Sequence, residues 1–277
     1  MSEPSADDVA LQAALAYDNV VVPRYARPFG DLLLRAVNIP ARANILDLSC
    51  RTGYPSVTLL GDIGEGRIVA IDSEAAFLEL ARARAGDEVG RRLFLKQESV
   101  EALPFGDDVF SNVIGNLIDR TTTDRGALLA ESSRVLRPQG QLVLTMPLRG
   151  SFAEVLDIFR EVALKHDLVG VPERIEQYAL SMPTREMWQT EIESRGFDDA
   201  VIEQEAFTLG FESGEHLLSD PAVLSAAAPE WQWCVATIED PASAFYWVQE
   251  AVDVYFSGRM FEVTVVAGCA AARKSRR

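Results

Sequence analysis

The pattern of apolar and polar positions predicts a chain in which short strands alternate with helices. Five segments are almost continuously apolar, as is typical of strands in a parallel sheet covered by helices on both faces. These predicted strands are residues 44–48, 66–71, 92–96, 109–116 and 141–146. Helical spacing of apolar residues predicts helices between them, at residues 53–60, 73–85 and 124–136, with Ser73 as the N-terminal cap of the second. Alternation at this pace predicts an α/β fold with a doubly wound sheet.

The two ends of the chain depart from this rhythm. A first helix is predicted to start at Asp7 or Asp8, either of which can cap it, and to end at Tyr17. A second amphipathic helix is predicted over residues 24–37, before Pro40. After Pro147 the pattern predicts helices at 151–167 and 183–194, a strand at 197–207, helical stretches at 211–257 and a last strand at 260–269.

We interpret the helical stretches at 211–257 as an insertion between the last two strands, because no low-complexity linker separates them from the sheet. The predicted parts are N-terminal lid helices at 1–40, a core at 41–208, a cap at 209–258, and a final strand with a basic tail at 259–277. The basic cluster at 273–277 is interpreted as a solvated tail.

Composition limits the kinds of partner and the cellular compartment that we expect for this chain. The chain has 277 residues, of which 48% are hydrophobic, and a formal net charge of −16. Such a surface repels nucleic-acid phosphates, so we expect no nucleic-acid partner. Three cysteines, at positions 50, 234 and 269, are too few and too far apart for a disulfide framework or a zinc site. Without an apolar run of about 18 residues or a signal peptide, we expect a cytoplasmic protein with no membrane insertion.

The segment that follows the first predicted strand carries the candidate chemistry. It reads Asn44-Ile-Leu-Asp-Leu-Ser-Cys-Arg-Thr-Gly53, so that an apolar strand ends at Asp47, a tight turn follows, and Gly53 opens a helix. This layout is typical of a nucleotide-type pocket at the carboxyl end of a parallel strand. The usual pattern is acidic-x-Gly-x-Gly-x-Gly, and here Ser49 and Arg51 stand at the first two glycine positions.

Several segments together resemble the class I S-adenosylmethionine-dependent methyltransferases of the ubiquinone/menaquinone-biosynthesis type. The similar segments are residues 17–29, 45–53, 68–72, 101–105 and 135–144. The match covers residues 15–147 well and residues 183–208 loosely. The resemblance implies a seven-stranded sheet of order 3-2-1-4-5-7-6 with the last strand antiparallel, and a cap above the substrate mouth.

The resemblance also implies which residues hold S-adenosylmethionine. The candidate cofactor-binding residues are Asp47, Ser49, Arg51, Gly53, Asp72, Ser73, Ser99, Val100, Asn116, Tyr17 and Tyr25. Asp47 would orient the methionine amino group, and Asp72 would accept both ribose hydroxyls. Ser99 and Val100 fall where the family reads adenine, with a serine in place of the usual carboxylate. Asn116 would line the side of methyl transfer.

Alternatives stay open at several of these positions. Asp72 also suits the N-terminal cap of the helix at 73–85. Tyr17 and Tyr25 suit either a mobile lid or plain packing of the N-terminal helices. Arg51 has three interpretations: it blocks the methionine slot, it pairs with the ligand carboxylate or with Asp72, or it faces solvent. The first and third leave open whether the cofactor site is retained at all.

No catalytic residue is predicted, and no metal. A sulfonium is already an activated methyl donor, so positioning supplies much of the acceleration. Of the two histidines, His166 is interpreted as a helix C-terminal cap and His216 as a surface residue.

The cap is rich in aromatic residues: Phe211, Trp231, Trp233, Phe245, Tyr246, Trp247, Tyr255 and Phe256. They suit a small apolar or aromatic acceptor, the cap's own core, or an interface with a second copy or a protein partner. Two functions follow: a methyltransferase acting on a small acceptor, or a catalytically inactive methyltransferase fold that serves as a binding or scaffold module. A nicotinamide-dependent oxidoreductase fits poorly, because no Gly-x-Gly-x-x-Gly follows the first strand.

Overall fold

The computed structural model describes residues 5–118 and 124–276. It divides into two compact units. Unit 1 comprises residues 1–146, 185–204 and 268–277, and unit 2 comprises residues 147–184 and 205–267. Residues 147–184, which the sequence pattern assigned to the core, are therefore grouped with the residues of the predicted cap.

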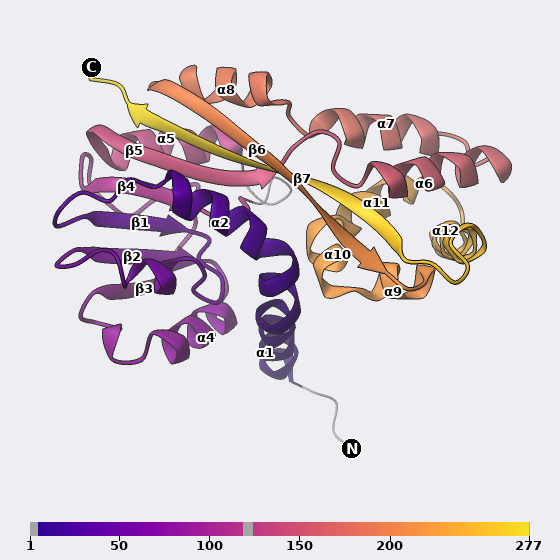
Figure 1. The fold of residues 1–277 in the computed structure, drawn as a ribbon, viewed down its shortest axis with the longest axis horizontal. Helices are drawn as coiled ribbons and strands as arrows, with labels where there is room; N and C mark the ends of the chain where they lie inside the picture. The colour runs from indigo at the N-terminus through magenta and orange to yellow at the C-terminus, as the bar shows by residue number, and fades with distance from the viewer. Residues whose placement is uncertain (1–4, 119–123, 277) are drawn as a thin grey trace. The chain divides into compact units, whose positions relative to one another are not determined.

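Seven strands of the described chain form one sheet in the order β3-β2-β1-β4-β5-β7-β6 (Figure 1). The strands are β1 Asn44–Leu48, β2 Arg67–Asp72, β3 Leu93–Gln97, β4 Phe110–Gly115, β5 Leu136–Pro147, β6 Phe197–Phe211 and β7 Phe261–Lys274. The first five run parallel, and β7 is antiparallel to both β5 and β6. This confirms the predicted fold class, strand order and antiparallel last strand.

Strand β1 lies between β2 and β4 and is buried along its whole length. Asp47 pairs in register with Ala70 of β2, two residues before Asp72 ends that strand. The two carboxylates therefore stand at the same edge of the sheet, where the carboxyl ends of parallel strands meet. Ligands of open α/β sheets bind at this edge.

The helices of unit 1 are α1 Ala6–Ala16, α2 Arg27–Ala36, α3 Ser56–Leu59, α4 Ala75–Ala85, α5 Arg125–Val135 and α8 Arg185–Glu193. The predicted cap of α1 was wrong: Ser5 caps it, and the Ser5 and Asp8 side chains form a capping box. The predicted helix at 24–37 begins only at Arg27, after a π-helical segment at Tyr17–Ala26 that contains Pro23. Proline has no N–H for a regular α-helical bond, which accounts for the wider turn.

Two further helix predictions need correction around the candidate loop. Helix α3 is four residues long instead of spanning 53–60, because Gly53 has a φ of +96° and Pro55 takes the N-cap position. Ser73 does not cap α4, whose N-cap is Glu74. The Glu74 N–H instead donates to Asp72 Oδ1 at 3.0 Å.

The C-terminal residues also differ from the prediction of a solvated tail. Strand β7 continues through Lys274. The Lys274 Nζ lies 2.7 Å from Asp108 Oδ1 and donates to the Leu136 carbonyl at 2.7 Å. Arg273 donates to the Gln139 carbonyl at 3.1 Å. These contacts attach the basic end of the chain to unit 1.

The helices of unit 2 are α6 Ala153–Lys165, α7 Val171–Ser181, α9 Gly214–Ser219, α10 Pro221–Ala226, α11 Ala228–Val235 and α12 Pro241–Tyr255. Helix α7 was not predicted from the sequence. Helix α6 packs against both α7 and α12. The core of the unit contains Trp231, whose ring lies 5.8 Å from Phe152 and 5.8 Å from Phe159.

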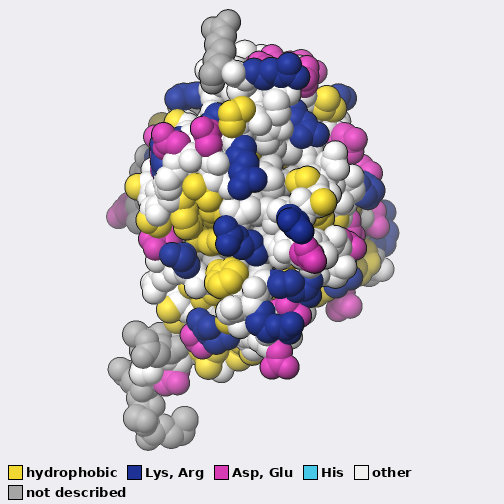
Figure 2. Space-filling view, turned by 90° about the vertical axis from the view of Figure 1, so that its left-hand side faces the viewer, with side chains coloured by type: hydrophobic (Ala, Val, Ile, Leu, Met, Phe, Trp, Pro, Cys, Tyr) yellow, Lys and Arg dark blue, Asp and Glu magenta, His cyan; other side chains and the backbone are white. Residues whose placement is uncertain are grey.

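Basic and acidic side chains are interspersed on the face drawn in Figure 2. Within unit 1, Arg42 pairs with Glu65, and both Arg91 and Arg92 pair with Glu88. The charge of each of these arginines is therefore balanced by a neighbouring glutamate. In the part of the chain that the structure describes, no helix is long and apolar enough to cross a membrane. The same residues contain no cluster of His, Cys, Asp and Glu arranged to hold a metal ion.

Candidate functional site

The loop after β1 has the backbone of a glycine-rich turn. Ser49, Arg51 and Gly53 have φ angles of +51°, +49° and +96°. Residues other than glycine rarely adopt this left-handed backbone conformation, because their Cβ atom comes too close to the backbone. The backbone therefore has a glycine-type conformation at all three positions, although two of them carry a side chain.

Gly53 is required for close packing as well as for its φ. A Cβ at this position would lie 3.0 Å from Val57 Cγ2 and 3.3 Å from the Cα of Ala81, which belongs to α4. A side chain at position 53 would therefore require Val57 and α4 to shift, in addition to the strain of the positive φ.

Asp47 is fully buried at the end of β1. Its Oδ2 accepts a hydrogen bond of 2.5 Å from Ser56 Oγ, and its Oδ1 has no hydrogen-bond partner among the described residues. Burial raises the pKa of Asp47 to about 8, against the opposing effect of the Ser56 bond, and the nearby Asp72 adds to the rise. An unpaired buried acceptor of this kind fits a cationic ligand group, which would favour ionisation of the carboxyl.

Asp72 ends β2 and is 2% exposed. Its Oδ2 accepts from the Arg51 N–H at 2.9 Å, and its Oδ1 accepts from the Glu74 N–H. The carboxylate thus joins the turn after β1 to the start of α4. Each oxygen retains a lone pair, so the predicted contact with ribose is compatible with these bonds and stays a prediction.

The Arg51 guanidinium lies against Asp72. Its Nη1 is 3.0 Å from Glu74 Oε1 and 3.9 Å from Asp72 Oδ1. Its Cζ is 4.9 Å from the centre of the Phe77 ring and 5.9 Å from that of Tyr17. Of the three interpretations, solvent-facing is wrong, because only 28% of the side chain is exposed. Pairing with Asp72 is the interpretation that the structure shows.

The N-terminal helices pack onto the core near this loop. Tyr17 contacts Phe77 edge-to-face at 5.3 Å, and burial raises the pKa of Tyr17 to about 12. Tyr25 is buried against Phe29. The Asn116 amide donates to the Ala26 carbonyl at 3.1 Å and accepts from Thr145 Oγ1 at 2.8 Å. The packing interpretation of these helices is confirmed, and their action as a lid stays a prediction.

The predicted adenine and loop residues have simpler surroundings. Ser99 is exposed, and its Oγ accepts from the Glu101 N–H at 3.3 Å, while Val100 is buried. Ser73 is exposed, and its carbonyl accepts from the Gln97 side chain at 2.9 Å. Neither contact tests a role in cofactor binding.

Three residues of the site escaped the sequence reasoning: Ser56, Glu74 and Phe77. Ser56 is the bonding partner of Asp47, and the other two hold Arg51. A signal existed for Glu74, which comes two residues after a strand-end acid and so stands at a helix start. No local pattern marked Ser56 or Phe77, because their partners depend on how the loop turns.

A cavity of about 480 Å³ lies behind the loop in unit 1. It is lined by residues of the N-terminal helices, by residues 53, 54, 57 and 58, and by Arg84 of α4. The Tyr54 hydroxyl bonds Asp31 Oδ1 at 3.0 Å, and Asp18 forms an ion pair with Arg84. The N-terminal segment is therefore connected to the loop and to α4 around this cavity.

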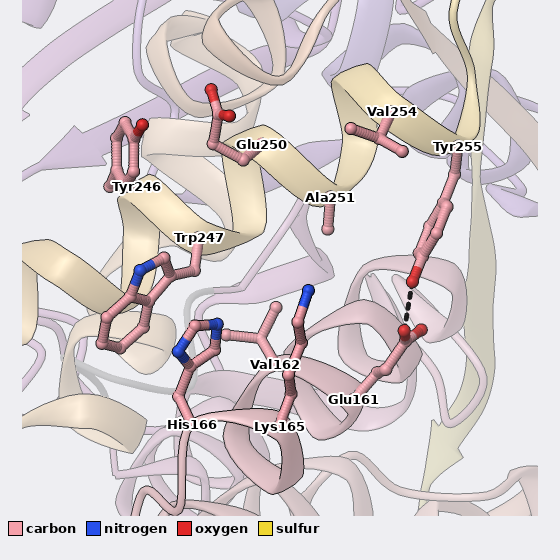
Figure 3. Close-up of a pocket in the computed structure, with 10 residues that line it drawn as sticks. All are labelled: Glu161, Val162, Lys165, His166, Tyr246, Trp247, Glu250, Ala251, Val254 and Tyr255. Carbon is pink, nitrogen blue, oxygen red and sulfur yellow. Dashed lines mark hydrogen bonds between the residues drawn. The ribbon is translucent and has the colours of Figure 1, made fainter.

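Unit 2 contains a second cavity, of about 280 Å³, between α6 and α12 (Figure 3). His166 stacks on Trp247 with ring centres 3.8 Å apart, and the Tyr255 hydroxyl bonds Glu161. His166 occupies the C-cap position of α6, as predicted. Tyr246 also lines this cavity and is 57% exposed.

The other cap residues divide between core and surface. Phe211 and Trp231 are buried and fill the core, whereas Trp233 is partly exposed under the Arg174 guanidinium. His216 is 39% exposed, with its Nε2 3.6 Å from Asp220. The core interpretation thus holds for part of the aromatic set and the surface interpretation for the rest.

Known proteins share this sequence pattern and this fold. A methyltransferase-domain family model matches residues 45–140. The chain is 30% identical over 227 residues to the malonyl-[acyl-carrier protein] O-methyltransferase of Halorhodospira halophila, a match that covers 78% of this chain and 68% of that protein. It is 40% identical over 99 residues to the ubiquinone/menaquinone biosynthesis C-methyltransferase of Xylella fastidiosa, covering 35% of this chain and 39% of that one.

Solved structures agree on the architecture. The phosphoethanolamine N-methyltransferase 2 of Haemonchus contortus, solved with S-adenosylmethionine, matches with a TM-score of 0.58 at 15% identity, over 98% of this chain and 57% of that one. The YcgJ protein of Bacillus subtilis matches with a TM-score of 0.58 at 15% identity, over 90% and 98%.

The sheet order and the left-handed loop after β1 define a class I methyltransferase fold. The chain belongs to the S-adenosylmethionine-dependent methyltransferases, of the kind that includes the ubiquinone/menaquinone biosynthesis enzymes.

Proposed function

We propose that this protein transfers a methyl group from S-adenosylmethionine to a small apolar or aromatic acceptor. The observation that carries the proposal is the loop after β1, which keeps three left-handed residues between two buried strand-end acids. When bound, S-adenosylmethionine supplies a methyl group on a sulfonium leaving group. The protein's own contribution is then to bind, to orient and to exclude water.

Each acid has a distinct task in this proposal. The unpaired Oδ1 of Asp47 would accept the ammonium of the methionine end. Asp72 would accept the ribose hydroxyls through its remaining lone pairs, as a charge-assisted pair. Ser99 would accept the adenine amine through its hydroxyl, more weakly than a carboxylate does.

The acceptor class rests on unit 2. Tyr246, Trp247 and Tyr255 line the cavity between α6 and α12 with aromatic surface that the core does not use. The two relatives named above are an O-methyltransferase and a C-methyltransferase, so their names do not choose the atom that is methylated. The net charge of −16 favours a small-molecule acceptor over a nucleic acid.

Isothermal titration calorimetry with S-adenosylmethionine tests the proposal. We expect wild-type protein to bind the cofactor with a micromolar Kd. Asp72→Asn should weaken binding at least tenfold, because a buried carboxylate that accepts two hydroxyls is lost. The matched control is Asp62→Asn, an exposed acid after α3, which should leave the Kd unchanged. An unchanged Kd in a folded Asp72→Asn protein would remove Asp72 from the site.

Two observations favour a second candidate, a methyltransferase fold that no longer turns over and serves as a binding or scaffold module. Arg51 lies against the acid that ribose would use, and Ser99 replaces the adenine-reading acid. For this candidate, wild-type protein gives no binding heat, and Arg51→Gly restores binding. Micromolar binding by the wild type supports the enzyme instead.

A further inference from the structure

Arg51 is held by two acids and two aromatic rings, at a position where the family pattern has a glycine. Glu74 lies within hydrogen-bond distance, Asp72 lies within ion-pair distance, and the faces of Phe77 and Tyr17 cover the guanidinium. The residue is therefore built into the site, and its backbone N–H also bonds Asp72.

An adenosyl ligand would change the contacts that Arg51 makes with Asp72. Ribose hydroxyls on Asp72 would compete with the guanidinium, whose Nη1 lies 3.9 Å from Asp72 Oδ1, and would so favour movement of Arg51 away from this carboxylate. The rings attract a cation but carry no net negative charge. A guanidinium that leaves Asp72 keeps its bond with Glu74, but it loses the attraction of the second carboxylate unless another anion replaces it.

The ligand itself contains one such anion. Its sulfonium and its ammonium repel a guanidinium, whereas the carboxylate of its methionine end attracts one. Arg51 stands in the middle of the loop, between the acid predicted to hold the ammonium and the acid predicted to hold the ribose. The carboxylate sits on the same carbon as that ammonium.

We propose that Arg51 makes this site selective for adenosyl ligands that carry a free carboxylate. The inference rests on the proposed cofactor site. In the structure Arg51 lies against Asp72, and a ligand displaces it with little net loss of binding free energy only when its carboxylate accepts the guanidinium.

Two ligands separate the contribution of the carboxylate from that of the adenosine. S-adenosylhomocysteine has the carboxylate, and 5′-methylthioadenosine has the same adenosine and thioether without the amino-acid end. We compare the Kd of 5′-methylthioadenosine divided by the Kd of S-adenosylhomocysteine. We expect this ratio to be at least tenfold lower in Arg51→Gly and in Arg51→Gln than in wild type. Arg51→Gly suits the left-handed φ, and Arg51→Gln keeps a polar side chain at this position without the charge.

The contribution of the Glu74 ion pair to the position of Arg51 is tested separately. Glu74→Gln leaves Arg51 in place but removes its strongest partner, so both probes should bind several-fold more tightly. Glu79→Gln, on the same helix and beside Arg82, is the matched control and should change neither Kd.

The outcomes are distinct. A Kd ratio that stays within threefold in both Arg51 variants, with S-adenosylhomocysteine still bound, overturns the selectivity and leaves the proposed function standing. Absence of S-adenosylhomocysteine binding in wild type and in all variants overturns the proposed function and the inference with it.

Discussion

At the residue scale, the site depends on backbone conformations that side chains disfavour. Ser49 and Arg51 both adopt positive φ, at about 1 kcal/mol or more each relative to glycine. Specific bonds hold the turn: the Arg51 N–H donates to Asp72, and the Cys50 N–H donates to the Ile71 carbonyl at 2.8 Å. A motif can therefore lose two glycines and keep its shape when neighbouring strands fix the loop.

Asp47 predicts a pH dependence of stability. In the folded protein its pKa is about 8, above the ordinary 3.8. The stability from this protonated carboxyl is fully present below about pH 4 and is lost as the pH rises through 8, because the folded state holds the proton longer than the unfolded chain. We expect the free energy of unfolding of wild type, relative to Asp47→Asn, to decrease by at most about 1.4 kcal/mol per pH unit between these limits.

Urea titrations from pH 5 to pH 8 measure this difference. Asp62→Asn, at an exposed position, serves as the control and should follow wild type at every pH. Parallel curves for wild type and Asp47→Asn would show that Asp47 is not protonated in the folded protein.

The sequence located this site but not its internal contacts. Asp47, Gly53 and Asp72 could be predicted because strand ends and glycine positions follow local rules. The contacts of Arg51 with Glu74 and Phe77 could not, since they depend on the direction in which a left-handed residue points its side chain. Residues distant along the chain meet there only after the sheet has formed.

At the scale of elements, Gly53 couples the loop to α4. Gly53→Ala should destabilise the protein by more than about 2 kcal/mol, because strain at φ +96° is joined by close contacts with Val57 and Ala81. Gly64→Ala is the matched control: its φ is +54°, and no atom lies within 4 Å of the added Cβ. It should lose only about 1 kcal/mol. Equal losses in thermal unfolding would mean that the loop does not press on α4.

Helix α5 holds the segment before β4 through Arg134. Its guanidinium donates to the carbonyls of Leu103 and Phe105 at 2.9 and 2.6 Å, and pairs with Glu131 and Asp107. Arg134→Ala should destabilise the protein by about 2 kcal/mol, the scale of charge-assisted bonds. It should also speed amide hydrogen exchange at residues 103–107. Exposed Arg137→Ala is the control, and unchanged exchange in Arg134→Ala would exclude this role.

Element predictions failed where a local pattern had two outcomes. Residues 17–26 have helical spacing, but Pro23 leaves them π-helical rather than α-helical. Strand β7 extends through a basic segment because Lys274 finds Asp108 and the Leu136 carbonyl. The second outcome depends on partners far along the chain, which periodicity does not record.

At the scale of the whole molecule, strand order was predictable and the division into units was not. The alternation of strands and helices predicted a doubly wound sheet, the family resemblance implied its order, and the sheet confirms both. Strands β6 and β7 each pass from one unit into the other. A continuous strand carries no composition change at such a boundary, so the sequence alone did not mark it.

The central claim is that an adenosyl ligand settles on the loop after β1 once Arg51 withdraws from Asp72. The most direct measurement is a crystal structure of the protein soaked with S-adenosylhomocysteine. We predict ligand density against residues 47–53, with ribose hydroxyls on Asp72 and the guanidinium moved to the ligand carboxylate. Arg51 unmoved against Asp72 and Glu74, with no ligand density at saturating concentration, would contradict the account.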